Sequence, residues 1–193
     1  RPDESIHKIA QKVLSRGNFE VQDFQNSQEI LKWLPQVDTV QHEAFADNRN
    51  YYPSSPEEFE LQAKNILAIS DPKFIKLILH DQAVAGFIIA YPNIGNSLRR
   101  SRGTIFPFGW IFILREKRHP RVLDINGVGM LPEYQGMGGN ALLYSELDKV
   151  ITSTRIKRAE IVQIDEHNQR SKSDMERLGV TFSKTHRTYI KSL

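Results

Sequence analysis

Residues 131–144, LPEYQGMGGNALLY, constrain the fold of this chain more than any other segment. Three glycines, at 136, 138 and 139, follow a proline and precede an apolar run with helical spacing. Glycine permits positive φ angles and carries no Cβ, and the first N–H groups of a helix lack partners and attract negative charge. The segment predicts a loop and helix start that bind an anion such as a pyrophosphate, with a plain strand-to-helix turn as the alternative.

The same segment partly fits a dinucleotide-binding fingerprint, because Gly136, Gly138 and Ala141 match G-x-G-x-x-A. Residues 131–135, however, separate the preceding strand from the first glycine, where the fingerprint needs an immediate turn. Asp165, the candidate ribose-binding acid, lies 29 residues past Gly136 instead of about 20. Only 28 residues follow Asp165, too few for a second nucleotide-binding half. We therefore exclude this class.

The strand expected over 122–131, VLDINGVGML, contains Gly127 and Gly129 within a β-favouring run. Glycine inside a strand indicates a bulge or a close approach of a ligand to the backbone. A bulge would separate this strand from the next one and leave unpaired backbone groups in a wedge. A ligand with amide groups could pair there like an added strand. A pyrophosphate on an amide-bearing arm describes coenzyme A.

The rest of the chain predicts an α/β fold with a mixed sheet, antiparallel strands first and then a parallel strand–helix–strand unit. Two strands, FIKLILHD and AVAGFIIAY, are expected to join at a hairpin turn, Asp81-Gln82. An aromatic stretch, 105–114, precedes a basic loop, 115–121. The other expected elements are helices over 4–14, 27–46 (interrupted near Pro35), 54–67, 94–101, 137–152 and 168–178, and strands over 19–24, 159–164 and 181–193.

Composition narrows the class of protein. The chain has 193 residues, no cysteine and a net charge of +3, which is too mild to indicate nucleic-acid binding. No segment approaches the ~18 apolar residues of a membrane helix, and the histidines lack metal-ligand spacing. We expect a cytoplasmic protein with no metal and with neither nucleic acid nor membrane as partner. We also expect an N-terminal helical arm, 1–17, before one domain, 18–193, within a chain that begins before Arg1.

Residues 130–140, MLPEYQGMGGN, resemble the central motif of the GNAT superfamily of acyl-CoA-dependent N-acyltransferases. Residues 168–180, NQRSKSDMERLGV, and the closing HRTYIKSL are similar to the family's later elements, and residues 45–114 resemble a bacterial subgroup. The resemblance implies a GNAT-like acyl-CoA N-acyltransferase fold: a mixed central sheet with a splayed strand pair and helices on both faces.

The resemblance also implies acetyl-CoA as cosubstrate and acetyl transfer to a primary amine, of a small molecule or a peptide, by direct attack. Met175 stands where many members carry the tyrosine that protonates the leaving thiolate. A non-catalytic acyl-CoA-binding sensor or partner module is therefore the alternative. The oligomeric state is left open between a monomer and a homodimer. The residues that the resemblance assigns to the cofactor are Val128, Gly129, Met130, Gln135, Gly136, Met137, Gly138, Gly139, Asn140, Asn168 and Ser171.

An ammonium acceptor must lose a proton before it attacks, so a base is needed. Asp124 is the first candidate, because on a regular strand it shares a face with Val128 and Met130, unless a bulge changes the parity. Its place six residues before Met130 is similar to that of the catalytic glutamate in histone-acetylating relatives. Glu166 and His167, just past the next strand, are second candidates.

Two other features have ordinary explanations. We expect the aromatic side chains of Phe106, Phe108 and Trp110 to pack in the core, with an acceptor pocket as the alternative. The basic runs 99–100 and 115–121 are expected to be solvated loops, with recognition of an acidic substrate or of the 3′-phosphate of CoA as the alternative.

Overall fold

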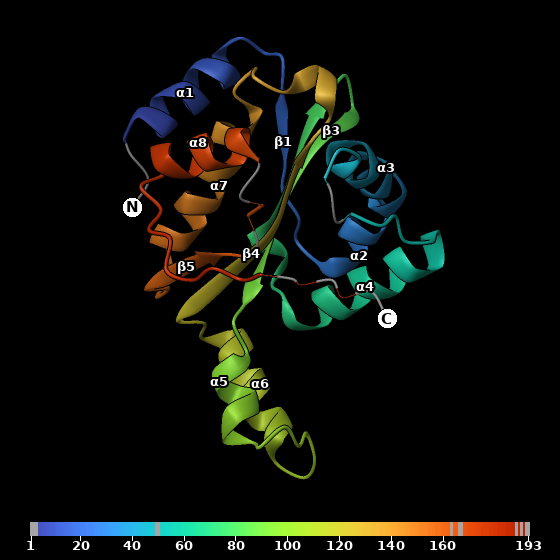
Figure 1. Cartoon of the computed structure of the whole chain (residues 1–193), viewed down its shortest axis with the longest axis vertical. Coiled ribbons are helices and arrows are strands. Elements are labelled where there is room, and N and C mark those ends of the chain that lie inside the picture. The colour runs from blue at the N-terminus through green and yellow to red at the C-terminus, as the bar shows by residue number, and fades with distance from the viewer. Residues whose placement is uncertain are drawn as a thin grey trace.

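The computed structural model describes residues 4–48, 51–162, 164–165, 168–187, 189 and 191. Five strands form one sheet in the order β1-β2-β3-β4-β5 (Figure 1). The first four strands pair antiparallel, and β4 and β5 pair in parallel, as the sequence predicted. The strands are β1 (Glu20–Gln22), β2 (Ile75–His80), β3 (Ala83–Pro92), β4 (Val122–Met130) and β5 (Arg158–Ile161).

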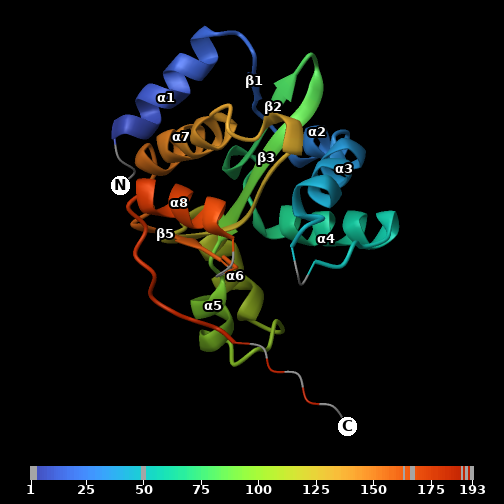
Figure 2. The ribbon, with the colours of Figure 1, turned by 45° about the horizontal axis from the view of Figure 1, so that its top comes forward.

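Helices cover both faces of the sheet (Figures 1 and 2). The α7 face, named here for its central helix, carries α1 (Glu4–Ser15), α7 (Gly139–Thr152) and α8 (Gln169–Arg177). The α3 face carries α2 (Ser27–Leu31), α3 (Leu34–Phe45) and α4 (Pro56–Ile69). Two further helices, α5 (Gly95–Arg100) and α6 (Gly109–Arg118), project beyond the end of the sheet, and the 3-10 turns are η1 (Pro72–Phe74) and η2 (Pro132–Tyr134).

Each face has its own apolar core, because alternate residues of a strand point to opposite sides of the sheet. On β3, Ile88 and Ala90 join the core of the α7 face, whereas Phe87 joins that of the α3 face and Ile89 packs against it. The uncharged, mostly buried strand AVAGFIIAYP is thus explained by burial on both sides.

Local signals in the sequence determine several boundaries. Asp81 and Gln82 both adopt positive φ angles, 47° and 65°, as the two central residues of a tight hairpin turn require. Ser55 caps α4 in a capping box with Glu58, and Pro56 occupies the first turn. The hairpin turn predicted at Asp81-Gln82 is confirmed, and α4 corresponds to the helix predicted over 54–67.

The interruption predicted near Pro35 within residues 27–46 is confirmed, since the chain turns at residues 32–33 and α3 restarts with Pro35 in its first turn. Two other predicted elements are wrong. Most of the basic loop 115–121 is instead the last part of α6. The strand over 181–193 does not form within the described residues, since 181–187, 189 and 191 belong to no helix or strand.

Helix α1 lies directly on α7, and its apolar side chains at Ile6, Ala10 and Val13 are buried in the core of the α7 face. The division of the chain into an arm, 1–17, and a domain, 18–193, stays a prediction. In this structure, however, the helix of the arm shares one core with the sheet.

Candidate active site

Strand β4 contains the predicted bulge. Ile89 of β3 lies opposite Gly127, and the next residue, Ala90, lies opposite Ile125, so Asn126 is the extra residue. The parallel pairing of β4 with β5 ends at this same point, at Ile125 and Ile161, followed by one hydrogen bond from the Val162 N–H to the Ile125 carbonyl at 3.1 Å. Among the described residues that follow Val162, no further pairing with β4 is seen, while β4 itself continues to Met130. The splayed strand pair that the sequence predicted is confirmed.

Two residues of β4 turn their backbone groups toward this wedge. The Leu131 N–H donates to the Ala85 carbonyl of β3 at 2.9 Å, so by antiparallel alternation Gly129 also faces β3. Val128 and Met130 therefore face away from β3. Their orientation agrees with the hydrogen bond from the Gln135 Nε2 amide to the Met130 carbonyl at 3.2 Å. Of the three predicted backbone contacts on β4, Val128 and Met130 face the wedge and Gly129 does not.

The two glycines within β4, Gly127 and Gly129, lie next to the aromatic ring of Phe87. A Cβ on Gly129 would lie 2.7 Å from the Phe87 ring, and one on Gly127 would lie 3.4 Å from it. Gly129 therefore makes room for Phe87 on the α3 face, whereas a Cβ on Gly127 would only touch the ring at an ordinary contact distance. The close backbone approach inferred from the sequence is thus made by an aromatic side chain of the protein itself.

The three glycines before α7 have different surroundings. Gly136 and Gly138 adopt positive φ angles of 82° and 88°, which explains glycine at both. A Cβ on Gly136 would meet no atom within 4 Å, whereas one on Gly138 would lie 2.7 Å from the Val13 side chain of α1. A Cβ on Gly139 would lie 2.5 Å from the Met130 Cε atom. Only Gly136 faces open space.

The start of α7 leaves backbone donors available. Its N-cap is Gly138, and no side chain of the described residues caps it. The first amides of the helix therefore lack both intrahelical and side-chain acceptors. Met137, beside them, is partly exposed. This loop, next to the wedge, has the character of an anion site.

Asn140 links this helix start to α8. Its Nδ2 amide donates to the Asp174 carboxylate at 3.0 Å, and its Oδ1 atom is buried with no hydrogen-bond partner in the described part of the chain. Beneath it, burial and then the charge of Asp174 raise the pKa of the Tyr144 phenol. The Asn140 Oδ1 atom, in the first turn of α7, is thus a buried acceptor without a donor among the described residues.

Asn168 and Ser171 have a structural role. The Asn168 side chain caps α8 by accepting the Ser171 N–H at 3.0 Å. This capping bond uses the Asn168 Oδ1 atom and the Ser171 N–H. Both residues are among those that the resemblance assigns to the cofactor. Met175, which stands where many family members carry a tyrosine, is buried in the core of the α7 face. Its side chain therefore contributes to packing in this chain.

Asp124 lies on the opposite face from the one expected. It pairs with Tyr91 of β3, while Val128 pairs with Ile88, and Tyr91 and Ile88 point to opposite sides of the sheet. The bulge at Asn126 causes this change, since one extra residue reverses the alternation. The bulge thus changes the parity, as the sequence-based expectation allowed, and Asp124 does not share a face with Val128 and Met130.

The surroundings of Asp124 suit a base. The side chain is partly buried, and this desolvation raises the pKa of its carboxyl above the ordinary value, with the Glu160 charge adding to the rise. The Asn93 Nδ2 amide donates to it at 3.0 Å and lowers the pKa in part, as does the Arg158 charge. Asp124 in turn contributes to the raised pKa of Tyr91, after desolvation.

Sequence reasoning did not identify Asn93 or Tyr91 as neighbours of Asp124. Both precede the projecting helices, in Tyr91-Pro92-Asn93, and only the strand register brings them to β4. Glu166 and His167, the second candidates, lie outside the described residues. Within the described ranges, no group of three or more His, Cys, Asp or Glu side chains could hold a metal ion. No helix in the described part of the chain has the length and apolar character needed to cross a membrane.

Residues 37–180 match the model of the acetyltransferase (GNAT) family, which is well over half of the chain. The chain belongs to the GNAT family. The fold agrees: a possible acetyltransferase from Clostridium difficile 630 superposes with a TM-score of 0.60, at 12% identity, over 91% of this chain and 98% of that one. Arabidopsis thaliana Naa50, in complex with the bisubstrate analogue CoA-Ac-MVNAL, gives 0.58 at 12% identity over 91% of both chains.

Among curated proteins, this GNAT chain is 25% identical over 160 residues to a bacterial ceramide synthase of Caulobacter vibrioides. That match covers 80% of this chain but only 42% of the relative, so the chain spans less than half of that protein's length.

Proposed function

We propose that this GNAT protein transfers an acetyl group from acetyl-CoA to a primary amine. The observation that carries the proposal is the wedge between β4 and β5, which opens at the Asn126 bulge beside an uncapped helix start. The Naa50 neighbour, solved with an analogue that joins CoA to a peptide, supports this placement by analogy of fold.

CoA would lie with its pyrophosphate on the backbone amides of Gly136 and residues 138–140 and its pantetheine arm along β4. From Met130 to Asn126 the strand spans roughly 13 Å, at about 3.3 Å per residue. The arm would pair with the outward backbone groups of Val128 and Met130 and bring the thioester to the bulge. An outward N–H there would stabilise the oxyanion that forms on attack.

The acceptor amine would approach from the α3 face, where Asp124 lies. Asp124 takes a proton from the ammonium, the free amine attacks the thioester carbonyl, and the C–S bond then breaks. The CoA sulfur leaves as a thiolate, which is tolerable because a thiol pKa is about 8.5, and the second proton of the attacking nitrogen passes through water to this sulfur. Met175 removes the usual acid without preventing this route. Much of the rate would come from holding both reactants in the wedge.

A second candidate is the transfer of a long acyl chain to a long-chain amine. The first curated relative is named a ceramide synthase, and a ceramide is an amide of a long-chain amine. The apolar side chains exposed around α5 and α6 favour this candidate as well. The non-catalytic acyl-CoA-binding module remains the alternative without turnover.

Calorimetric titration with acetyl-CoA tests the cofactor. We expect micromolar binding, about −8 kcal/mol. Gly136→Glu should abolish it, because the side chain enters open space over the loop amides. Gly103→Glu is the matched control: Gly103 also has a positive φ, 77°, and no atom near its Cβ position, but it lies between α5 and α6. No binding by the wild type would overturn the proposal.

Turnover separates the candidates. CoA-thiol release would be followed with acetyl-, octanoyl- and palmitoyl-CoA, each against a short amine, a peptide and a long-chain amine. Release with acetyl-CoA and a short amine or peptide supports the first candidate, and release only with the long partners supports the second. Binding without release under any pairing would favour the non-catalytic module.

A further inference from the structure

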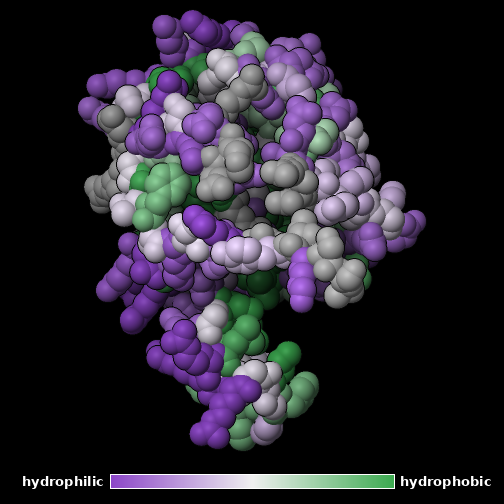
Figure 3. Space-filling view, viewed as in Figure 1, coloured by the Kyte–Doolittle hydropathy of each residue, from purple (hydrophilic) through white to green (hydrophobic). Residues whose placement is uncertain are grey.

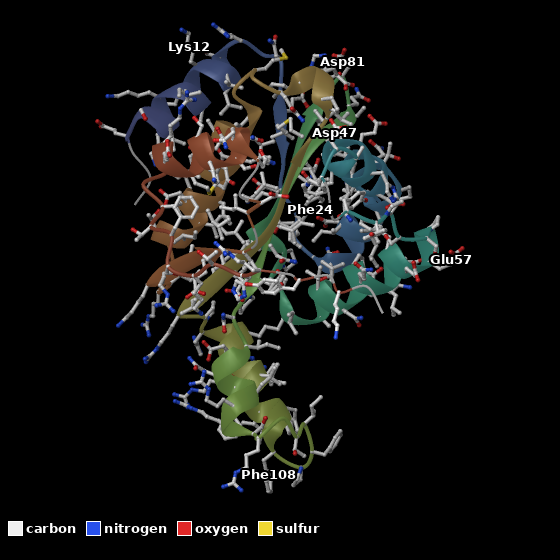
Figure 4. All side chains as sticks on the ribbon, viewed as in Figure 1. Lys12, Phe24, Asp47, Glu57, Asp81 and Phe108 are labelled. Carbon is white, nitrogen blue, oxygen red and sulfur yellow. The ribbon has the colours of Figure 1, made fainter. Side chains whose placement is uncertain are left out.

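Residues 93–121, called here the α5–α6 hairpin, leave the sheet between β3 and β4 and project from one end of the molecule (Figure 1). Phe108 lies at the far end of this hairpin, away from the two cores (Figure 4). The candidate active site does not use this end of the molecule, and the side chains at the tip are exposed among the residues that the structure describes.

The tip of the hairpin exposes its largest apolar side chains, so the expected core packing of this aromatic stretch is wrong. The exposed fractions are 51% for Ile105, 78% for Phe106, 67% for Phe108 and 47% for Trp110. Apolar and polar surfaces lie on different sides of the hairpin (Figure 3). Such a concentration of exposed aromatic surface marks an interaction site.

The exposure is fixed by the backbone of the tip. The Trp110 N–H donates to the Ile105 carbonyl at 3.0 Å, and the Trp110 Nε1 atom donates to the Pro107 carbonyl at 2.9 Å. A Cβ on Gly109 would lie 2.0 Å from the Thr104 carbonyl oxygen, so only glycine permits this close turn. The aromatic rings are held outward by a compact turn.

The hairpin is also the basic part of the chain. It holds one acidic residue, Glu116, against seven basic ones, so it carries +6 while the whole chain carries +3. A shallow hollow of about 390 Å³ on α6 combines Ile111 and Leu114 with Arg115 and Arg118. The seven basic residues are Arg99, Arg100, Arg102, Arg115, Lys117, Arg118 and Arg121.

We propose that the α5–α6 hairpin docks on an anionic lipid surface, with its aromatic tip at the boundary of headgroups and acyl chains. Exposed aromatic rings flanked by arginines match that boundary, where rings enter the apolar layer and cations meet lipid phosphates. A stable protein partner needs about 800 Å² from each side, more than four side chains at a narrow tip offer. This proposal departs from the sequence-based expectation of no membrane partner, and it concerns peripheral contact alone.

The root of the hairpin adjoins the candidate base. Asn93 donates to the Asp124 carboxylate and accepts the Gly95 N–H at 3.0 Å, so one side chain joins the start of α5 to Asp124. A docked hairpin would hold Asp124 at a fixed distance from the lipid surface. In a consequence that rests on the proposed function, an amine borne by a lipid would reach the base from there.

Tryptophan fluorescence gives a direct test. The chain has two tryptophans, so Trp33→Phe leaves Trp110 as the only reporter. With vesicles of phosphatidylcholine and phosphatidylglycerol we expect a blue shift of Trp110 emission and co-sedimentation, both weakened by salt. Vesicles of phosphatidylcholine alone should bind much less. No shift and no sedimentation with the anionic vesicles would overturn the proposal.

Paired variants locate the binding surface. Phe106→Ser with Phe108→Ser, and separately Arg99→Gln with Arg100→Gln, should each reduce vesicle binding at least tenfold. The control, Tyr52→Ser with Leu61→Ser, removes two side chains that are 86% and 61% exposed outside the hairpin and should bind as the wild type does. Equal losses in the control would refute the assignment.

Two further measurements keep the outcomes distinct. Light scattering that finds a dimer, abolished by the Phe106 and Phe108 changes, would assign the tip to a second copy and overturn the lipid proposal. Acetyl-CoA titration of the same variants should match the wild type. Failure of vesicle binding with intact CoA binding would therefore refute the hairpin proposal alone.

Discussion

Asn126 decides which side of the sheet carries the candidate base. Because it is one extra residue in β4, Asp124 pairs with Tyr91 and lies on the α3 face, while Val128 stays on the α7 face. The thioester and the base would then meet through the wedge from opposite sides. In this arrangement the acceptor amine would reach the wedge from the α3 face, and CoA would reach it from the other side.

The role of Asp124 can be tested by Asp124→Asn. We expect kcat/KM to fall about 10²- to 10⁴-fold, because the amide cannot take the proton from the acceptor. The affinity for acetyl-CoA should stay unchanged in calorimetry. Glu160→Gln, which changes the carboxylate paired beside it on β5, should stay close to wild type. Full activity of Asp124→Asn would remove the assignment.

Asn93 should tune the pH dependence of the reaction. Its donated hydrogen bond stabilises the charged form of Asp124 and lowers the pKa of that carboxyl against the raising effect of burial. Asn93→Ala should therefore raise this pKa, so that kcat/KM declines at a higher pH as the solution is acidified. The acid limb of the pH profile measures the shift. Asn96→Ala, a change in α5 near Asn93, is the control, and a shift toward lower pH in Asn93→Ala would contradict the assignment.

At the scale of elements, the start of α7 is positioned by Met130. Its thioether lies under Gly139 and beside Gly86, since a Cβ on either would come within 2.7 Å of the Met130 Cε atom. Strand β4, which borders the wedge, therefore also limits how closely the start of α7 can approach the sheet. Packing and the candidate phosphate site share these residues.

Gly139→Ala should destabilise the fold by about 1–3 kcal/mol, as overpacking does in a filled core. Adding Met130→Val should recover much of this loss, because the shorter side chain removes the contact at 2.5 Å. Urea unfolding of the single and double variants measures both effects. Gly136→Ala, with no neighbour at its Cβ position, should cost only the 1–2 kcal/mol of its positive φ. Additive losses in the double variant would argue against the contact.

At the scale of the whole molecule, the sheet with its two cores and the α5–α6 hairpin are separable. Neither core contains a residue of 93–121, all of which the structure describes. The strands on either side remain adjacent where the hairpin leaves them, since Pro92 pairs with Leu123. Neither core therefore includes the charged and exposed apolar side chains of the hairpin.

Replacing residues 95–118 by a short Gly/Ser turn should leave a folded protein. We expect the Tm to stay within about 4 °C, a change equivalent to roughly 1 kcal/mol for a chain of this size. Binding of acetyl-CoA should persist, because the glycine loop lies at the other end of β4. Thermal unfolding and calorimetry measure both, and a cooperative transition lost on replacement would show that the hairpin supports the core.

The sequence by itself determined the features that depend on neighbouring residues. Ser55 with Glu58 predicts the start of α4, Asp81-Gln82 predicts the turn, and the glycines before α7 predict the loop and, through the motif, the family. These signals are local because caps, turns and positive φ angles are satisfied within a few residues.

The tertiary structure alone decided what depends on distant partners. The face of Asp124 follows from the pairing of β3 with β4, and Gly138 is confined by Val13 of α1, 125 positions earlier in the chain. The exposure of Phe108 depends on the projection of its hairpin beyond both cores. A pattern of residue types records which side chains are apolar, but register and packing between remote segments determine what each one meets.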